Sequence, residues 1–155
     1  MMPVYPIRAA TMALPAPAMR AVTERYWELT EPYSFRWGAI IFTAPTGWRT
    51  DGASIPRLLW ATGSPLDGHV LPAAIAHDVL YSTHYVTRAE ADRLFLDRMV
   101  ANGVARWKAW SYYANVRAWG WLAWRQKPWA IDAARGKVGV LIGCEELPAT
   151  PEARP

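Results

Sequence analysis

The chain has 155 residues, a formal net charge of +4, ten Trp and seven Tyr against three Phe, and a single cysteine. This length suits one domain with a real core, and the lone Cys144, which we interpret as a small hydrophobic residue, excludes the class of secreted proteins that depend on internal disulfides. No stretch approaches the ~18 uninterrupted apolar residues of a membrane-spanning helix, and the first residues lack the pattern of a signal peptide, so we expect a protein of the cytosol or one assembled there.

The predicted elements begin with an extended N-terminal arm, residues 1–22, which is rich in Pro, Ala and Met. An apolar arm that cannot fold alone often docks on a neighbouring subunit. Residues 25–50 follow with many β-favouring Tyr, Trp, Phe and Ile residues, interrupted by Glu-Pro, Trp-Gly and Pro-Thr-Gly turns. This pattern predicts a small antiparallel β-sheet of two to four short strands.

The stretch "TDGASIPRLLW" comes next and predicts a turn followed by a short helix over residues 57–60. Ser54 is placed to cap this helix, and the Asp-Gly pair at Asp51 is typical of a turn. For these residues we favour turn formation and helix capping over ligand binding.

Three helices are predicted after this loop region. The first covers residues 72–82, the second begins after a Thr-x-x-Glu capping box at Thr87 and ends at an Asn-Gly pair, and the third covers residues 105–125. Strands followed by helices indicate an α+β fold. We therefore predict one α+β domain over residues 23–130, then a C-terminal extension, residues 131–155, whose end is expected to be disordered.

Asp92 is the most unusual residue of the second predicted helix. On a helical wheel, Phe95, Leu96 and Met99 define an apolar face, and Asp92 falls in the middle of it. A carboxylate in that position is costly unless it accepts hydrogen bonds or has a charged partner. The sequence therefore predicts that polar groups from another element meet Asp92.

The preceding helix offers such partners. His77 and Tyr81 are four residues apart and project from the same face, so antiparallel packing of the two helices brings both to Asp92. A carboxylate on one imidazole nitrogen fixes the tautomer and leaves the other nitrogen as a base. Asp78 lies ~100° around the helix from His77 and is expected to face the loops instead.

The stretches "HDVLY" and "ADRLF" resemble the active-site pattern of phospholipase-A2-like enzymes, which include the small domain in parvovirus capsids. The resemblance implies that His77 activates a water, that Asp92 orients His77, and that Tyr81 donates a hydrogen bond to Asp92. It also implies that Asp78 ligates a calcium ion that polarises an ester carbonyl. The glycine-rich calcium loop of those enzymes has no good match here, and only "GSPLDG" or the "TDGAS" segment with Asp51 could replace it.

A second resemblance covers residues 26–124. The blocks "GWRTDGASIPRLLW", "AAIAHDVLY" and "TRAEADRLF", in this order and spacing, resemble a family of small tailed-phage and prophage proteins of uncharacterised function. The resemblance implies a phage-encoded protein that is part of the particle or of its assembly. It implies a location in the virion after assembly in the host cytoplasm, and it supplies no reaction.

The third predicted helix is rich in aromatic residues, and no acidic residue lies between Asp97 and Asp132. Its aromatic side chains occupy nearly all directions on the wheel, which is typical of a helix that is buried or shared with a partner. The candidate interface residues are Trp107, Trp110, Trp119, Trp121 and Trp124. We expect a protein interface first, with other phage structural proteins or a second copy, and a lipid surface second. Nucleic acid is not expected, because the basic residues are sparse and no recognised motif is present.

Two function classes follow from these observations. The first is a virion-associated structural or accessory protein, a tail, neck or capsid component, that binds its neighbours through the arm and the Trp-rich helix. The second is a calcium-dependent, phospholipase-A2-like lipid or ester hydrolase that acts on the host envelope with His77 as its base. Two interpretations of the His77, Tyr81 and Asp92 cluster stay open, because such clusters also occur as buried polar networks that hold two helices in register.

Overall fold

The computed structural model describes residues 13–23, 26–37, 40–50, 68–125 and 141–144. Its described strands form two three-stranded sheets in which every pairing is antiparallel. The first sheet has the order β1-β2-β5 and consists of β1 (Met19–Ala21), β2 (Trp27–Leu29) and β5 (Arg49–Thr50). The second has the order β3-β4-β6 and consists of β3 (Tyr33–Trp37), β4 (Ile40–Ala44) and β6 (Leu141–Cys144).

The predicted α+β class is confirmed, with the strand region divided between two sheets. The chain leaves the first sheet after Leu29, and the segment that follows contains Pro32, which has no N–H to donate to a ladder. β3 and β4 then pair with each other, whereas β5 returns to β2. The sixth strand, β6, lies in the predicted C-terminal extension. It joins the second sheet by pairing with β4.

The helices agree closely with the prediction. They are α1 (Leu71–Thr83), α2 (Arg88–Ala101), α3 (Arg106–Trp119) and α4 (Trp121–Trp124). Thr87 caps α2 in a complete capping box, because its side chain accepts from the Glu90 backbone N–H while the Glu90 side chain accepts from the Thr87 backbone. After α2 the chain turns at Gly103, whose φ of 88° favours glycine. The predicted third helix is divided by Gly120 into α3 and α4.

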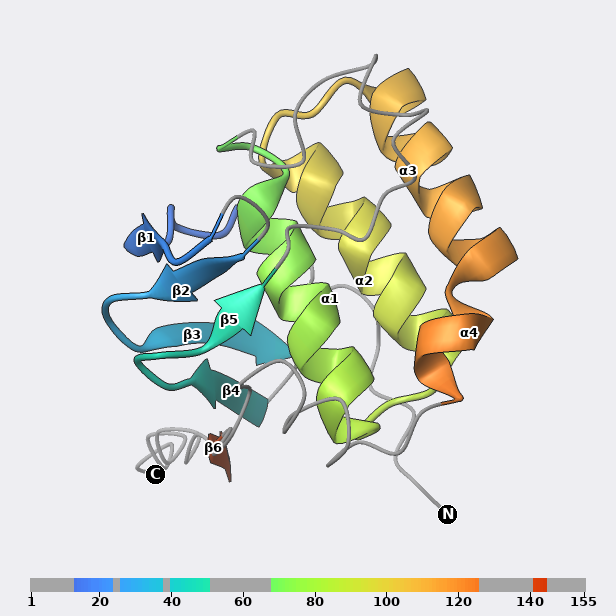
Figure 1. Cartoon of the computed structure of the whole chain (residues 1–155). Coiled ribbons are helices and arrows are strands. Elements are labelled where there is room, and N and C mark those ends of the chain that lie inside the picture. Colours follow the sequence, from blue (N-terminus) through green and yellow to red (C-terminus); the bar gives the residue numbers. More distant parts are fainter. Residues whose placement is uncertain (1–12, 24–25, 38–39, 51–67, 126–140, 145–155) are drawn as a thin grey trace, which may run out of the picture.

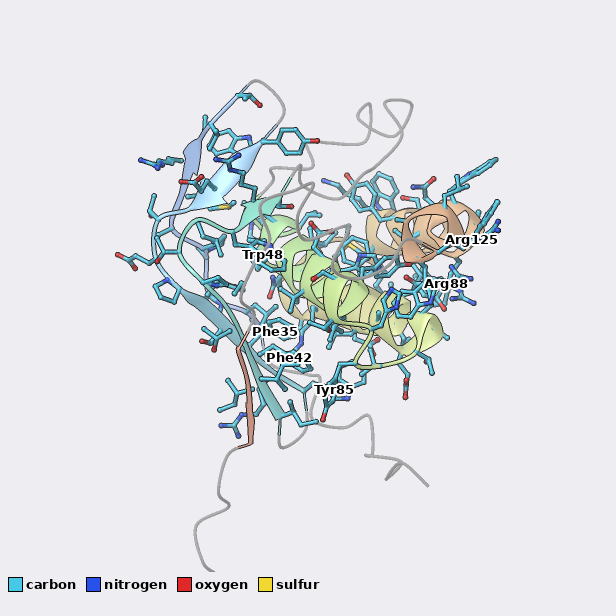
Figure 2. The ribbon with its side chains drawn as sticks, turned by 60° about the horizontal axis from the view of Figure 1, so that its bottom comes forward. Phe35, Phe42, Trp48, Tyr85, Arg88 and Arg125 are labelled. Carbon is cyan, nitrogen blue, oxygen red and sulfur yellow. The ribbon has the colours of Figure 1, made fainter. Side chains whose placement is uncertain are left out.

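The elements form successive layers, with the strands on one side of α1, then α2, and α3 outermost (Figure 1). One hydrophobic cluster joins the strands to α1 and α2. It includes Phe35 and Phe42, whose stacked rings lie 5.2 Å apart, and the fully buried Trp48, all of which lie between strands and helices in Figure 2. A second cluster, with Phe95 and Tyr112, joins α1, α2 and α3. α1 and α2 contribute to both clusters, so they are held from two sides. None of the described helices is both long and apolar enough to cross a membrane.

The described part of the predicted arm packs on its own domain. The Leu14 backbone N–H donates to Asn102 Oδ1 at 2.7 Å, and the Tyr33 hydroxyl donates to the Pro15 carbonyl at 2.9 Å. Residues 19–21 form β1 and pair with β2. Residues 1–12 of the arm, the predicted short helix over residues 57–60 and the Asp51 turn lie outside the described residues.

Candidate functional site

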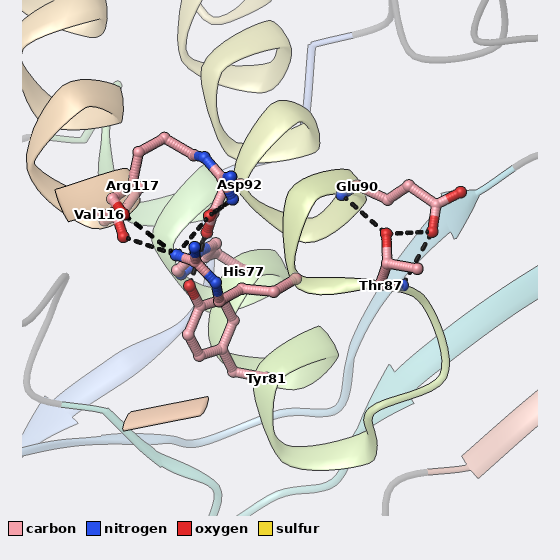
Figure 3. Close-up of polar contacts among 8 residues, drawn as sticks. His77, Tyr81, Thr87, Glu90, Asp92, Val116 and Arg117 are labelled. Carbon is pink, nitrogen blue, oxygen red and sulfur yellow. Dashed lines mark hydrogen bonds and ion pairs between the residues drawn. The ribbon is translucent and has the colours of Figure 1, made fainter. Parts of the chain in front are cut away.

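Asp92 is the centre of the candidate site and is fully buried on α2. One carboxylate oxygen, Oδ1, lies 2.9 Å from His77 Nε2 and accepts a 2.6 Å hydrogen bond from the Tyr81 hydroxyl (Figure 3). Both partners come from α1, one turn apart, as the helix periodicity predicted. The contact between Asp92 and its two predicted partners is therefore confirmed.

Two arginines bind the other carboxylate oxygen of Asp92, Oδ2. Arg117 of α3 donates to Asp92 Oδ2 at 2.8 Å, and Arg88 of α2 lies 3.3 Å from the same oxygen. Arg88 also donates to the backbone carbonyls of Val116 and Arg117 at 3.3 and 3.2 Å. These carbonyls belong to the last turn of α3, so Arg88 ties the end of α3 to α2. Asp92 thus receives side chains from three helices (Figure 3).

These contacts keep Asp92 ionised. Burial raises the pKa of the Asp92 carboxyl, but hydrogen bonds from His77, Tyr81 and Arg117 outweigh this effect and place the pKa below its ordinary value of 3.8. Burial, together with the bond to Asp92, raises the pKa of the Tyr81 hydroxyl, which therefore stays protonated and donates. The hydrogen bond to Asp92 also raises the pKa of Arg117.

His77 is buried and packs against two aromatic rings. The centroids of Tyr81 and Phe95 lie 4.1 and 4.9 Å from the imidazole centroid. Because the ionised Asp92 carboxylate can only accept, His77 Nε2–H donates the hydrogen bond to it. In the neutral imidazole the lone pair then lies on Nδ1. No partner of Nδ1 is found among the residues that the structure describes. The arrangement can therefore supply an oriented imidazole base.

Asp78 faces a different part of the molecule, as its position on the wheel predicted. It is buried, and its Oδ2 accepts a 2.9 Å hydrogen bond from the Thr50 hydroxyl at the end of β5. Asp51, the other predicted calcium ligand, is the next residue after Thr50 and lies outside the described residues. Within the described ranges, no group of three or more His, Cys, Asp or Glu side chains comes together to hold a metal ion.

Sequence reasoning missed three residues of this site. Arg88 precedes Asp92 by four residues, a helical spacing that signals an ion pair and could have found it. Arg117 comes from another helix and has no such local signal. Gly120 is also special, because a methyl group there would lie 2.5 Å from the Tyr81 hydroxyl and would overlap the Val116 carbonyl. Only glycine lets the α3–α4 junction approach α1 so closely.

The five predicted interface tryptophans fall into two groups. The side chains of Trp107, Trp110, Trp119 and Trp121 are exposed. Trp124 is partly buried, and its ring stacks on His84 at 4.0 Å and meets Tyr81 edge to face at 5.0 Å. The aromatic residues in all directions of the predicted third helix therefore have two different surroundings. Those on one side pack against the domain, and those on the other side are exposed.

The comparisons with known proteins give a family without a known activity. The family model described as "Protein of unknown function (DUF1353)" matches residues 27–116. Uncharacterized protein y4jT of Sinorhizobium fredii (strain NBRC 101917 / NGR234) is 38% identical over 96 residues, which cover 61% of this chain and 29% of that protein. Uncharacterized protein y4iH of the same strain is 40% identical over 79 residues, 48% of this chain and 33% of that protein. The chain thus spans about a third of the length of these curated relatives. No solved structure matches it.

The close packing around Gly120 predicts that even a substitution by alanine lowers the stability of the fold. We expect Gly120→Ala to lower the free energy of unfolding by about 1–3 kcal/mol, because the added methyl group meets the Tyr81 hydroxyl and the Val116 carbonyl. Urea unfolding measures this change. Gly68→Ala is the matched control, since a Cβ there meets nothing within 4 Å, and we expect it to be neutral or slightly stabilising. Equal effects of the two substitutions would contradict the close approach.

The buried carboxylate predicts a dependence of stability on pH. Its folded-state pKa is lowered, so its stabilisation is present above the unfolded value and is lost as the pH falls through the folded value. At neutral pH, we expect Asp92→Asn to cost about 3 kcal/mol or more, because two arginines lose a buried partner.

Urea unfolding across acidic pH measures this contribution as the difference between wild type and Asp92→Asn. The difference should shrink as the pH falls below about 4. Asp97→Asn is the control, because Asp97 pairs with Arg93 on the outside of α2, where such a pair contributes less than about 0.5 kcal/mol. Parallel pH profiles of wild type and Asp92→Asn would show that the carboxylate does not carry the effect.

Proposed function

The chain belongs to this family of proteins of unknown function (DUF1353), and we propose that it is a hydrolase that cleaves ester bonds in phospholipids with His77 as general base. The observation that supports the proposal is the contact of His77 Nε2 with Asp92 at 2.9 Å, with Tyr81 bound to the same carboxylate oxygen. This geometry agrees with what the resemblance to phospholipase-A2-like enzymes implies for these three residues. His77, Tyr81 and Asp92 all lie within the part of the chain that the family model matches.

The proposed reaction uses the free imidazole nitrogen. His77 Nδ1 takes a proton from a water molecule, and the water oxygen attacks the carbonyl carbon of the ester. The tetrahedral intermediate collapses to the carboxylic acid, and the leaving alkoxide takes the proton back from the imidazolium. Asp92 stabilises the imidazolium during these steps and holds the ring in place, as the carboxylate does in the serine hydrolase triad. Arg88 and Arg117 keep Asp92 ionised throughout.

Calcium is a separate part of the proposal, and no step above depends on it. Among the described residues no three His, Cys, Asp or Glu side chains come together, so calcium ligands beside Asp78 would be backbone carbonyls, waters or residues outside the described ranges. Asp78 would contribute one carboxylate, which already accepts a hydrogen bond from Thr50. The assay therefore treats calcium as a variable.

The experiment is the release of fatty acid from phospholipid vesicles by the purified full chain, with calcium and with a chelator. We expect His77→Ala to lower the rate by at least about a hundredfold, the usual contribution of a general base. His69→Ala is the matched control, because His69 is an exposed histidine whose Nδ1 lies 2.8 Å from the Asn102 carbonyl, away from Asp92. Circular dichroism checks that each variant is folded.

Two results would overturn the hydrolase proposal. A folded wild-type chain without hydrolysis under either condition would leave the cluster as a polar network that holds three helices together. A folded His77→Ala variant with an unchanged rate would place the base elsewhere. Loss of activity in the chelator alone, with Asp78→Asn equally inactive, would support the calcium part of the proposal.

A second candidate function is favoured by the exposed tryptophans of α3 and α4. Large exposed aromatic side chains are typical of surfaces that bind partners. Together with the resemblance to tailed-phage and prophage proteins, they support a virion-associated structural or accessory protein. Its partners would be other phage structural proteins or further copies of this chain. A virion subunit can also carry the hydrolase activity, so the two functions are compatible.

Particle association tests this second function. We expect a tagged full-length chain, produced in cells that make the encoding phage, to sediment with purified particles in a density gradient. A chain that lacks residues 1–12 should lose this association if the arm binds neighbouring subunits. The deletion must end at residue 12, because Leu14 and Pro15 already bond to the domain and β1 follows. A chain found only in the soluble fraction would contradict the virion role.

A further inference from the structure

The outer face of α3 and α4 takes no part in the catalytic proposal. Figure 1 shows α3 as the outermost helix, on the side of the molecule away from the strands. α3 packs inward through Ala109 and Tyr112, its two buried residues. The exposed fractions of the outer tryptophans are 66% for Trp107, 52% for Trp110 and 41% for Trp121. These side chains are costly to leave in water unless they meet a partner.

The spacing of the exposed residues places them on one stripe. Trp107, Trp110, Ala114 and Ala118 are all exposed and follow each other at intervals of three, four and four residues, which is one face of an α-helix. Helical hydrogen bonds continue through the junction, from the Gly120 N–H to the Val116 carbonyl and from the Trp124 N–H to the Gly120 carbonyl. We define the outer face by the large apolar side chains on this side, which are Trp107, Trp110, Trp121 and Leu122. Trp119 is also exposed but lies about 120° around the helix from Trp107.

The charge around the outer face has a single sign. Residues 106–125 contain Arg106, Lys108, Arg117 and Arg125 and no acidic residue. Arg117 is bound to Asp92, and the Lys108 ammonium lies 5.9 Å from the centroid of the buried Tyr112 ring, so Arg106 and Arg125 are the cations that we assign to a partner. Arg125 lies with its guanidinium 5.5 Å from the centroid of the exposed Trp121 ring. Cations beside exposed indole rings match the boundary between lipid headgroups and acyl chains, where Trp, Arg and Lys are all favoured.

The acidic residues of the neighbouring helix do not cancel this charge. On α2, Asp92 is bound by two arginines, and Asp97 accepts from Arg93 at 3.1 Å. Glu90 is held in the capping box with Thr87. The same charge argues against a second copy, because two outer faces in contact would bring like charges together. It favours an anionic partner with an apolar interior.

We propose that the outer face of α3 and α4 binds an anionic phospholipid surface, with the indole rings inserted at headgroup level and Arg106 and Arg125 beside the lipid phosphates. The binding does not depend on hydrolysis, because none of these residues contacts His77 or Asp92. It would hold the chain against a bilayer whether the protein is an enzyme or a virion component. A protein partner at the same face is an outcome that the test distinguishes.

The experiment is co-sedimentation of the purified full chain with vesicles. One set consists of phosphatidylcholine alone, and the other of equimolar phosphatidylcholine and phosphatidylglycerol. We expect binding to the anionic set, weakened by salt. Trp107→Ser with Trp110→Ser should weaken it by about tenfold or more. Arg106→Gln with Arg125→Gln should weaken it by roughly 25-fold, since each cation near an anionic surface contributes about fivefold.

The controls separate this proposal from the others. Val22→Ser with Ile142→Ser changes one exposed apolar side chain directly after β1 and one in β6, and this variant should bind like wild type. His77→Ala should also bind like wild type, so failure of the hydrolase proposal and failure of lipid binding give different results. Thermal unfolding confirms that each variant is folded.

Three outcomes would overturn lipid binding at this face. The first is binding that the Trp107 and Trp110 substitutions leave unchanged. The second is equal affinity for neutral and anionic vesicles. The third is no vesicle binding, with a dimer in analytical ultracentrifugation that the same Trp substitutions dissociate, which would assign the outer face to a second copy.

Discussion

The ionised carboxylate of Asp92 is the interaction on which the arrangement of the helices depends. It is fully buried, so it must be compensated by donors that the protein supplies. α1 supplies His77 and Tyr81, α2 supplies Arg88, and α3 supplies Arg117. No one of these helices can move without exposing a charge to an apolar interior. The apolar clusters on either side set the layers, and Asp92 sets the register between them.

The same constraint determines what His77 can do. Its ring is fixed by Asp92 at Nε2 and by the faces of Tyr81 and Phe95, so one nitrogen is held in a defined direction. A network with a purely structural role requires only that every buried polar group be paired. Here His77 Nε2 takes part in compensating the Asp92 charge together with Tyr81 and Arg117. The Nδ1 atom of the same ring is not needed for that compensation, and it is the atom to which we assign a chemical role.

Local periodicity explains why the core of the site could be predicted from the sequence. His77 and Tyr81 share a helix face because they are four residues apart, and Asp92 interrupts an apolar face that its own helix defines. The capping box at Thr87 and Glu90 is equally local. Arg117 and Gly120 could not be found in this way, because their roles depend on how α3 and α4 cross α1.

The arrangement of the strands could also be predicted only in part from the sequence. β1 and β6 are three and four residues long and both lie outside the strand region that the sequence predicts. β1 pairs with the neighbouring β2, whereas β6 pairs with β4, which is far from it in the sequence. Tertiary contacts, rather than their own residue pattern, define such short strands. The division into two sheets follows from these pairings, so it could not be predicted from the turns between the strands.

α3 and α4 connect the buried site with the outer face, because different residues of one helical segment belong to each. Arg117 reaches inward to Asp92, whereas Trp110 and Trp121 point away from the domain. Gly120 lies against the Tyr81 hydroxyl at the junction between the two helices. A shift of α4 relative to α3 must therefore change the space around Tyr81, which in turn donates to Asp92. Because packed interiors do not deform continuously, the position of this segment and the geometry of the His77–Asp92 pair are set together, and a partner that binds the outer face acts on a segment that already contacts the site.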